Sequence, residues 1–282
     1  GTLPMITSCS PGWINFVEKN YPDLLDHVSS SKSPQQMFGA IAKTYYADKM
    51  GIPRDKMFVV SVMPCIAKKY ECQRPEMNSS GYQDVDVVLT TRELAKMIRM
   101  AGLDFNFLQE EEFDNPMGLG SGAGAIFGTS GGVMEAAIRT VYEVVTGKEP
   151  QSLDFTACRG HEGIKEATLD LDGTPVKVAI TNGLKNARVL MEKIRAGEAD
   201  YQFIEVMCCP GGCVGGGGQP FRTTAAIREH RMDGLYTVDK NQKIRQSHKN
   251  PHIQELYQEF LKEPNSELAH ELLHTHYRDR SK

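Results

Sequence analysis

Seven cysteines are the residues of this 282-residue sequence with the greatest capacity for chemistry. Three of them lie within six residues and the others are scattered: Cys208, Cys209 and Cys213, against Cys9, Cys65, Cys72 and Cys158. An odd number of cysteines with this distribution does not suit a disulfide framework. Metal binding or redox chemistry is therefore the favoured interpretation.

The segment Glu205–Pro220 places two thiols, Cys209 and Cys213, beside a proline and a run of glycines. Glycines let the backbone approach a cluster and direct N–H groups at its sulfides. Soft thiolates bind iron–sulfur clusters, zinc or copper(I), so this loop alone does not choose between them, and a tight turn with incidental cysteines is the structural alternative. A zinc site usually has paired C-x₂₋₄-C knuckles, and one such pair is found here. A buried cluster held by several loops is therefore favoured over zinc.

Cys65 directly follows a predicted buried strand and is followed three residues later by Lys68. An isolated cysteine at such a place is commonly a small buried apolar residue. A lysine close to the end of a buried strand needs an anionic partner, because an unpaired buried ammonium is costly. An anionic cluster or its ligands would provide that partner. A pair with Glu71, or exposure to solvent, is the alternative.

Strands alternate with helices along the chain. Short apolar runs predict buried strands over 57–63, 85–89, 176–180 and 201–207. Helical patterns cover most of the chain after residue 250 and five earlier segments: 13–25, 33–50, 90–100, 133–145 and 184–194. This order predicts an α/β fold with largely parallel sheets flanked by helices. The cysteine loops directly follow two of the strands, and the carboxyl ends of strands are where such sheets place their sites.

Three segments together resemble the signature motifs of [FeFe]-hydrogenases, whose patterns are TSCCPxW, MPCxxKxxE and ExMxCxxGCxxGGGxP. Here the segments are Thr7–Trp13, Met63–Glu71 and Glu205–Pro220. The resemblance spans nearly the whole chain, including 33–36, 90–94 and 121–127. It implies a two-lobed iron-hydrogenase catalytic domain over 1–249 with its active site between the lobes, and a C-terminal helical segment over 250–282. The N-terminal part of the family domain is expected to be missing.

The resemblance also implies the H-cluster, in which a [4Fe–4S] cubane is joined through one cysteine to a di-iron unit carrying CO, cyanide and azadithiolate. Mapped by motif, Cys65, Cys209 and Cys213 match cubane ligands, and Cys213 matches the bridging one. Lys68 matches the residue that hydrogen-bonds a cyanide. Further cofactor contacts match two polar-shell residues and three residues of an apolar wall that excludes water: Pro34 and Gln35, with Met63, Phe127 and Met207.

The reaction implied by the resemblance is the reversible reduction of protons to H₂. Electrons would be exchanged with ferredoxin or an NAD(P)-linked partner subunit, and maturation proteins would assemble the cofactor. Cys9 matches the proton-delivering cysteine, for which a near-neutral pKa is expected, and Ser29 matches the next hydroxyl of the relay. The alternatives are an iron–sulfur assembly factor related to hydrogenases, a sensory hydrogenase and a structural zinc protein. Lys68, Met63 and Met207 favour the enzyme over the assembly factor.

The first motif departs from the family pattern at one position. Where two successive cysteines are usual, this chain has Cys9 followed by Ser10, and the second position matches the fourth cubane ligand. Three interpretations are open: Cys9 takes over ligation, Ser10 binds as an alkoxide, which is a harder and weaker ligand for iron, or the site is crippled. Cys208, the extra thiol beside Cys209, is a further candidate to compensate.

Charge and hydropathy exclude two classes of function. A net charge of −4 gives no electrostatic footprint for nucleic acid. No apolar stretch approaches the roughly 18 residues needed to span a bilayer. The first ten residues lack the basic and apolar regions of an export signal. We therefore expect a cytoplasmic protein with no nucleic-acid partner and no membrane span.

Overall fold

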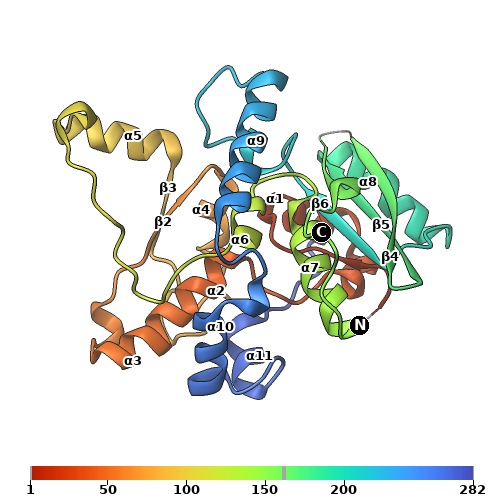
Figure 1. Cartoon of the computed structure of the whole chain (residues 1–282), viewed down its shortest axis with the longest axis horizontal. Helices are drawn as coiled ribbons and strands as arrows, with labels where there is room; N and C mark the ends of the chain where they lie inside the picture. The colour runs from red at the N-terminus through yellow and green to blue at the C-terminus, as the bar shows by residue number, and fades with distance from the viewer. Residues whose placement is uncertain (1, 161–162, 282) are drawn as a thin grey trace.

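The fold contains two separate β-sheets, one in each lobe of the molecule (Figure 1). The structure is a computed structural model of the chain, and it describes residues 2–160 and 163–281. The larger sheet has the order β1–β6–β5–β4, from β1 (Met5–Ile6), β4 (Ile164–Leu171), β5 (Thr174–Asn182) and β6 (Phe203–Met207). The smaller sheet pairs β2 (Val60–Met63) with β3 (Val87–Thr90). All of these pairs are parallel except β4–β5, which confirms the predicted α/β class.

Helices flank both sheets and join the two lobes. In the described part of the chain they are α1 (Pro11–Asn20), α2 (Pro34–Ile41), α3 (Ala47–Met50), α4 (Ala67–Glu71), α5 (Thr91–Met100), α6 (Gly122–Ile126), α7 (Gly132–Thr146), α8 (Leu184–Arg195), α9 (Ala225–Asn241), α10 (Pro251–Leu256) and α11 (Glu267–Leu273). The helices predicted over 90–100, 133–145 and 184–194 are confirmed to within two residues. The one predicted over 33–50 is present as α2 and α3 with a π-helical segment between them.

The larger sheet has a hydrophobic core on each face. Alternation along β5 divides its side chains between these cores, since successive residues of a strand point to opposite faces. Ala179 packs on the side of α1 and α8, where Trp13 is fully buried. Val178 and Ile180 pack against Met134 of α7 on the other side. The sheet is therefore held between helices on both faces, and the loops at the carboxyl ends of its parallel strands have a firm base.

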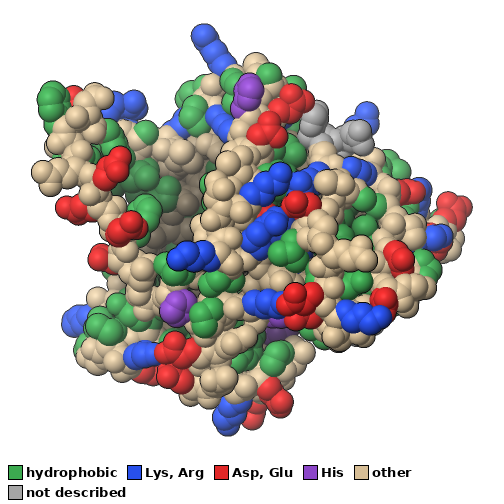
Figure 2. All heavy atoms as spheres, in the orientation of Figure 1, with side chains coloured by type: hydrophobic (Ala, Val, Ile, Leu, Met, Phe, Trp, Pro, Cys, Tyr) green, Lys and Arg blue, Asp and Glu red, His purple; other side chains and the backbone are tan. Residues whose placement is uncertain are grey.

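The smaller lobe is less completely covered. Thr90 and Glu93 form the predicted capping box that starts α5, because each side chain bonds the other residue's backbone amide. No residue of α5 is buried, however, and the helix projects as an arm from the lobe. Figure 2 shows the surface hollowed between this arm and the centre of the molecule. Val60 and Val62 of β2 remain 47% and 45% exposed.

The fold differs from the sequence-based expectation at several elements, including strands β2 and β4 and helix α9. Strand β2 begins at Val60, so the predicted strand over 57–63 was too long. Strand β4 was missed, although the Asp172-Gly173 dipeptide that joins it to β5, with φ of 53° and 89°, is a recognised hairpin signal. Helix α9 was missed as well; Thr224 caps it, and its polar and apolar residues are mixed without a strong period. Among the described residues no helix has the length and apolar character for a membrane crossing.

Candidate metal centre

The first and third cysteine loops leave neighbouring parallel strands at the same edge of the larger sheet. Thr7 continues the pairing of β1 with β6: its amide donates to Ile204 O at 3.0 Å and its hydroxyl accepts from Val206 N at 3.0 Å. The indole of Trp13 donates to Thr7 O at 3.0 Å. The chain from Thr7 to Trp13 is therefore fixed at both ends, and Cys9 lies between them, beside the end of β6 from which Cys208 and Cys209 emerge.

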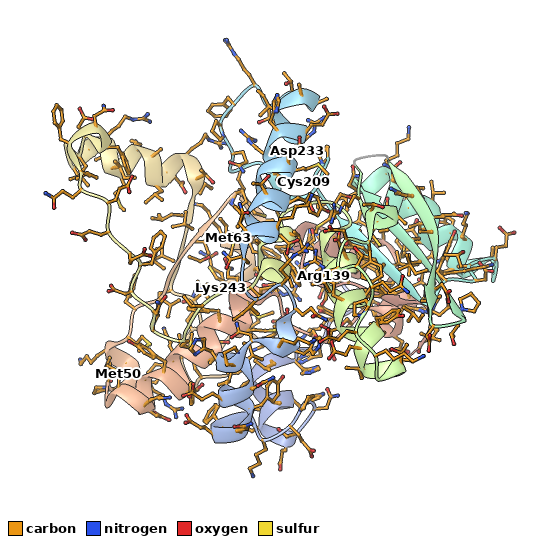
Figure 3. All side chains as sticks on the ribbon, in the orientation of Figure 1. Met50, Met63, Arg139, Cys209, Asp233 and Lys243 are labelled. Atoms are coloured by element: carbon orange, nitrogen blue, oxygen red, sulfur yellow. The ribbon has the colours of Figure 1, made fainter. Side chains whose placement is uncertain are left out.

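The second cysteine loop is joined to the third by close backbone contact across the two sheets. The amide of Gly218 donates to Pro64 O at 2.9 Å. A side chain at Gly216 would place its Cβ 2.0 Å from Pro64 O, and one at Gly218 would lie 2.9 Å from Cys65 N. Glycine is required at both positions because backbone occupies that space. The glycine run thus holds Cys65 against the loop of Cys209, which lies in the central region between the lobes (Figure 3).

A left-handed turn brings Cys213 back toward Cys209. Gly211 and Gly212 have φ of 76° and 89°, a region that favours glycine. The amide of Val214 donates to Gly128 O at 3.0 Å and the amide of Ser130 donates to Gly211 O at 3.0 Å. The turn is therefore anchored on the segment between α6 and α7.

The three predicted cubane ligands lie in one group. Burial raises the pKa of Cys213 to about 11, with electrostatic contributions from Cys65 and Cys209. Burial also raises the pKa of Cys65. A hydrogen bond with the Cys208 thiol lowers the pKa of Cys209 to about 6. Three thiols from two loops, which influence one another electrostatically, form a soft donor set for iron.

Across residues 2–160 and 163–281, no three His, Cys, Asp or Glu side chains are placed to bind one ion. A cubane takes each thiolate on a separate iron, so its ligands stand farther apart than those of a zinc site. Donors of one soft type and glycines that bring backbone amides close are both suited to an iron–sulfur cluster.

A buried cation lies beside this group of thiols. Lys68 Nζ donates to Glu71 Oε2 at 2.9 Å, to Glu71 Oε1 at 3.2 Å and to Cys9 O at 3.1 Å. The ion pair with Glu71, given above as an alternative partner for the lysine, is therefore present. The Glu71 carboxylate also accepts from Ser33 Oγ at 2.8 Å and from Gln35 Nε2 at 3.2 Å. The lysine is consequently held close to the first cysteine loop.

Two glutamines next to this ion pair have polar atoms without a partner. Gln35 Oε1 and both Gln36 side-chain polar atoms are buried and make no hydrogen bond. Leaving a buried polar group unsatisfied costs about 1–3 kcal/mol, so such atoms call for an explanation. A polar group bound beside the lysine would explain Gln35, and the residues present therefore fit the cofactor that the motifs imply.

Desolvation dominates the surroundings of the Cys9 thiol. Burial raises its pKa to about 12, although the positive charge of Lys68 opposes the shift. The expected near-neutral pKa of Cys9 is therefore wrong for the chain without cofactor, because desolvation of the thiolate outweighs the positive charge of Lys68.

Ser29 follows the bridge between Ile6 and Val28, and its hydroxyl accepts from Ser31 N at 3.3 Å. Its place in a proton relay stays a prediction.

The other predicted contact residues occupy separate positions. Pro34 is exposed at the first turn of α2. Met63 packs with the cluster of Cys72 and the strands of the smaller sheet, whereas Phe127 packs with helices α6, α7 and α9. Met207 is 3% exposed at the end of β6. Met63 and Phe127 belong to different packing groups, and a common apolar wall stays a prediction.

Glu205 is a buried titratable residue that sequence reasoning left without a role. Its carboxylate accepts from Gly131 N at 2.6 Å and from Met134 N at 2.7 Å, at the start of α7. Burial raises its pKa to about 7 despite these amides. The sequence did contain a signal for this residue, because Glu205 is part of the third motif and is a charged residue inside an otherwise apolar strand.

Thiols from three loops that meet between two sheets, with a buried lysine beside them, are features expected of an α/β iron–sulfur protein. Comparison with known proteins makes the class specific. Residues 1–217 match the iron only hydrogenase large subunit, C-terminal domain, and residues 225–280 match the iron hydrogenase small subunit. The chain belongs to the iron-only hydrogenase family.

Individual relatives agree with this assignment. The chain is 53% identical to the NADP-reducing hydrogenase subunit HndD of Solidesulfovibrio fructosivorans over 98% of its own length and 47% of that protein. It is 55% identical to the periplasmic [Fe] hydrogenase large subunit of Nitratidesulfovibrio vulgaris over 77% of this chain and 52% of that protein. The chain therefore spans about half the length of these curated relatives.

A solved structure and a more distant relative complete the comparison. The [FeFe]-hydrogenase HydA(deltaEFG), described in connection with stepwise H-cluster assembly, matches with a TM-score of 0.84 and 46% identity over 98% of this chain and 76% of that one. Cytosolic iron-sulfur assembly component 3 of Rattus norvegicus is 33% identical over 98% of this chain and 59% of that protein. Both hydrogenases and an assembly component are thus among the relatives.

Proposed function

We propose that the protein containing this chain catalyses the reversible reduction of protons to H₂ at an H-cluster. The observation that carries the proposal is the meeting of Cys65 of the second cysteine loop with Cys209 and Cys213 of the third, with Lys68 and Cys9 beside them. A cluster-binding protein without this chemistry has less need of a buried lysine aimed at the first cysteine loop. The higher identity to hydrogenases, 53% against 33% for the assembly component, supports the same choice.

Each residue has a distinct task in this proposal. Cys65, Cys209 and Cys213 would hold the cubane, and Cys213 would also hold the di-iron unit. When bound, the H-cluster supplies the electrons and the iron site at which protons are reduced. Lys68, which Glu71 fixes in place, would donate to a cyanide ligand and so hold the cofactor in one orientation.

Proton delivery is assigned to Cys9. Its buried thiol is protonated at neutral pH, so it holds a proton inside the protein next to Lys68. Ser29, at the same edge of the larger sheet, would pass protons onward toward the surface. Met63, Phe127 and Met207 would exclude water from the reduced metal.

Electrons would come from ferredoxin or from an NAD(P)-linked partner subunit. The relative named as a subunit of an NADP-reducing hydrogenase supports the second source. Maturation proteins would be needed as partners, since the di-iron ligands cannot form from protein residues alone.

Infrared spectroscopy of the protein matured with the di-iron cofactor tests the proposal. We expect bands of iron-bound CO and cyanide in the unaltered chain and in Cys72→Ala, a control that removes a buried thiol outside the site. Cys213→Ala should lack these bands, because the link between the two iron units is removed. Absence of bands in the unaltered chain, with its cubane present and maturation competent, would leave the assembly-factor function in place of the enzyme.

A further inference from the structure

The fourth thiolate of the cubane is missing from its usual place, because Ser10 stands where the family pattern has cysteine. An extra thiol, Cys208, is present in the third loop. We propose that Cys208 supplies this fourth ligand, so that the thiol has moved from one loop to the adjacent one. This inference rests on the cubane part of the proposed function and is independent of the di-iron unit.

Cys208 and Ser10 are in direct contact. The amide of Cys208 donates to Ser10 Oγ at 3.3 Å, so the hydroxyl already serves as an acceptor for the backbone of the third loop. Residues 10 and 208 follow the neighbouring parallel strands β1 and β6. A cysteine lost from one of these positions and gained at the other leaves the number of thiols at this edge unchanged.

Gly12 provides the space that the Cys208 thiol occupies. A Cβ at residue 12 would lie 2.7 Å from Cys208 Sγ, so a side chain there would push the thiol out of its present position. The thiol therefore lies over the start of α1, close to residue 10, in space that is open because Gly12 has no side chain.

Cys208 and Cys9 have different thiol neighbours. The Cys208 thiol hydrogen-bonds with Cys209 and interacts electrostatically with Cys65. Cys9 instead has Lys68 and Cys213 as its foremost charged neighbours. Cys208 therefore lies on the side of Cys65 and Cys209, whereas Cys9 lies on the side of Lys68 and Cys213.

Adjacent side chains on a strand point to opposite faces, which would keep Cys208 and Cys209 apart. Strand β6 ends at Met207, however, and both cysteines lie beyond it. The two thiols form a hydrogen bond with each other, so they lie on the same side of the loop. Ligation then replaces the S–H bond of Cys208 with an S–Fe bond and releases a proton to solvent, with no electron transferred. A thiolate is also a softer ligand than a serine alkoxide, which suits iron–sulfur chemistry.

Cluster reconstitution of single variants of the full chain tests the assignment. We expect Cys208→Ala to retain about three irons after mild oxidation, where the unaltered chain retains about four, and to show the electron paramagnetic resonance signal of a [3Fe–4S] cluster. Ser10→Ala and Cys9→Ala should keep the [4Fe–4S] cluster. The double variant Ser10→Cys with Cys208→Ala should recover it, which also shows that the loss is not a folding defect.

A second variant tests the same contact from the other side. As a single substitution, Gly12→Ala should speed the loss of iron to a chelator by roughly 10-fold relative to the unaltered chain, because it displaces the Cys208 thiol. In the double variant Ser10→Cys with Cys208→Ala, where residue 10 supplies the ligand, Gly12→Ala should have little effect on the rate of iron loss.

Three results would overturn the inference: loss of iron in Ser10→Ala, loss of iron in Cys9→Ala, or equal iron content in all three alanine variants. Failure of the unaltered chain to bind any cubane would instead contradict the proposed function.

Discussion

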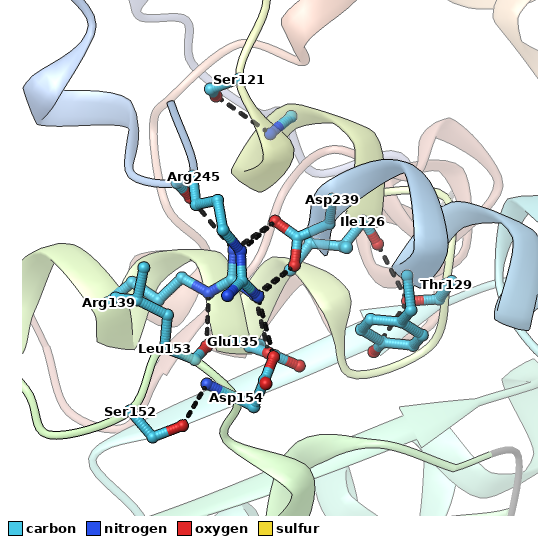
Figure 4. A network of polar contacts seen from close by, with 12 residues as sticks. Ser121, Ile126, Thr129, Glu135, Arg139, Ser152, Leu153, Asp154, Asp239 and Arg245 are labelled. Atoms are coloured by element: carbon cyan, nitrogen blue, oxygen red, sulfur yellow. Dashed lines mark hydrogen bonds and ion pairs between the residues drawn. The ribbon is translucent and has the colours of Figure 1, made fainter. Parts of the chain in front are cut away.

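Arg139 and Lys68 are both buried cations beside buried carboxylates, one between α7 and α9 and the other beside the cysteine loops. Arg139 uses all five of its N–H donors: on Leu153 O, Arg245 O, Glu135 and both carboxylate oxygens of Asp239 (Figure 4). The two carboxylates have further arginine partners, since Arg159 bonds Glu135 and Arg245 bonds Asp239. Within this network every charge is paired.

The polar cluster around Lys68, in contrast, still has buried polar atoms without hydrogen-bond partners, and we call it open for this reason. Glu71 is the charged partner of the lysine, and the remaining donors to that carboxylate are neutral. The neighbouring glutamines carry three buried polar atoms that bond nothing. A closed network ties two helices together, whereas an open one retains capacity for a ligand. The difference separates a structural use of buried charge from a binding use.

Replacing Arg139 should give the largest loss of stability. Arg139→Met leaves Glu135 and Asp239 buried with one cation each and leaves two backbone carbonyls without their donor. Removing one partner of a buried charge network costs about 3–5 kcal/mol. Urea unfolding of the cofactor-free chain measures this cost. The exposed pair of Lys148 and Asp172 provides the control, because Lys148→Met should cost less than about 1 kcal/mol.

The Arg139 comparison fails if the two variants unfold at the same urea concentration. Such a result would mean that Arg159 and Arg245 alone satisfy the carboxylates, and that the network is less dependent on its central residue than the hydrogen bonds indicate.

Glu205 sharpens the comparison, because its buried carboxylate is bonded by backbone amides rather than by a cation. Arginine hydrogen bonds outweigh burial at Asp239 and hold its pKa below the usual range, whereas burial dominates at Glu205 and raises its pKa to about 7. The folded chain therefore binds this proton more tightly than the unfolded chain. The stabilisation is complete below the unfolded pKa, near 4.5, and is lost as the pH rises through about 7.

We expect the unfolding free energy to fall by about 3 kcal/mol through this group between pH 4.5 and pH 7.5. Comparing the cofactor-free chain with Glu205→Gln over this range isolates the contribution, since glutamine keeps the shape and does not titrate. A constant difference between the two proteins across the range would show that the amides keep the carboxylate ionised.

Sequence reasoning found the part of the site that depends on local pattern. The loops of Cys65 and Cys209 follow strands, and the capping box at Thr90 forms as predicted. The charge network was not predictable in the same way, because Arg139 and Asp239 are a hundred residues apart and lie on helices whose packing no motif records. Likewise, nothing in the sequence shows that Gly12 leaves room for the thiol of Cys208.

Replacing Lys68 should give the smallest change in stability of the three. Lys68→Met removes three hydrogen bonds, but Ser33 and Gln35 still donate to Glu71, and the lysine side chain is 9% exposed, so water can reach the carboxylate. We expect a loss of about 1–3 kcal/mol in the cofactor-free chain, less than for Arg139→Met.

The double variant Lys68→Met with Glu71→Met should recover most of that loss, because replacing both partners of a buried pair with apolar residues is often neutral. In the matured protein the same lysine variant should lower H₂ production by about 10- to 100-fold, the effect typical of removing a residue that orients a metal ligand. A large loss of stability with unchanged H₂ production would reverse the comparison, making Lys68 a structural cation like Arg139. A small loss of stability with a large loss of activity identifies the open cluster as the one built for a ligand.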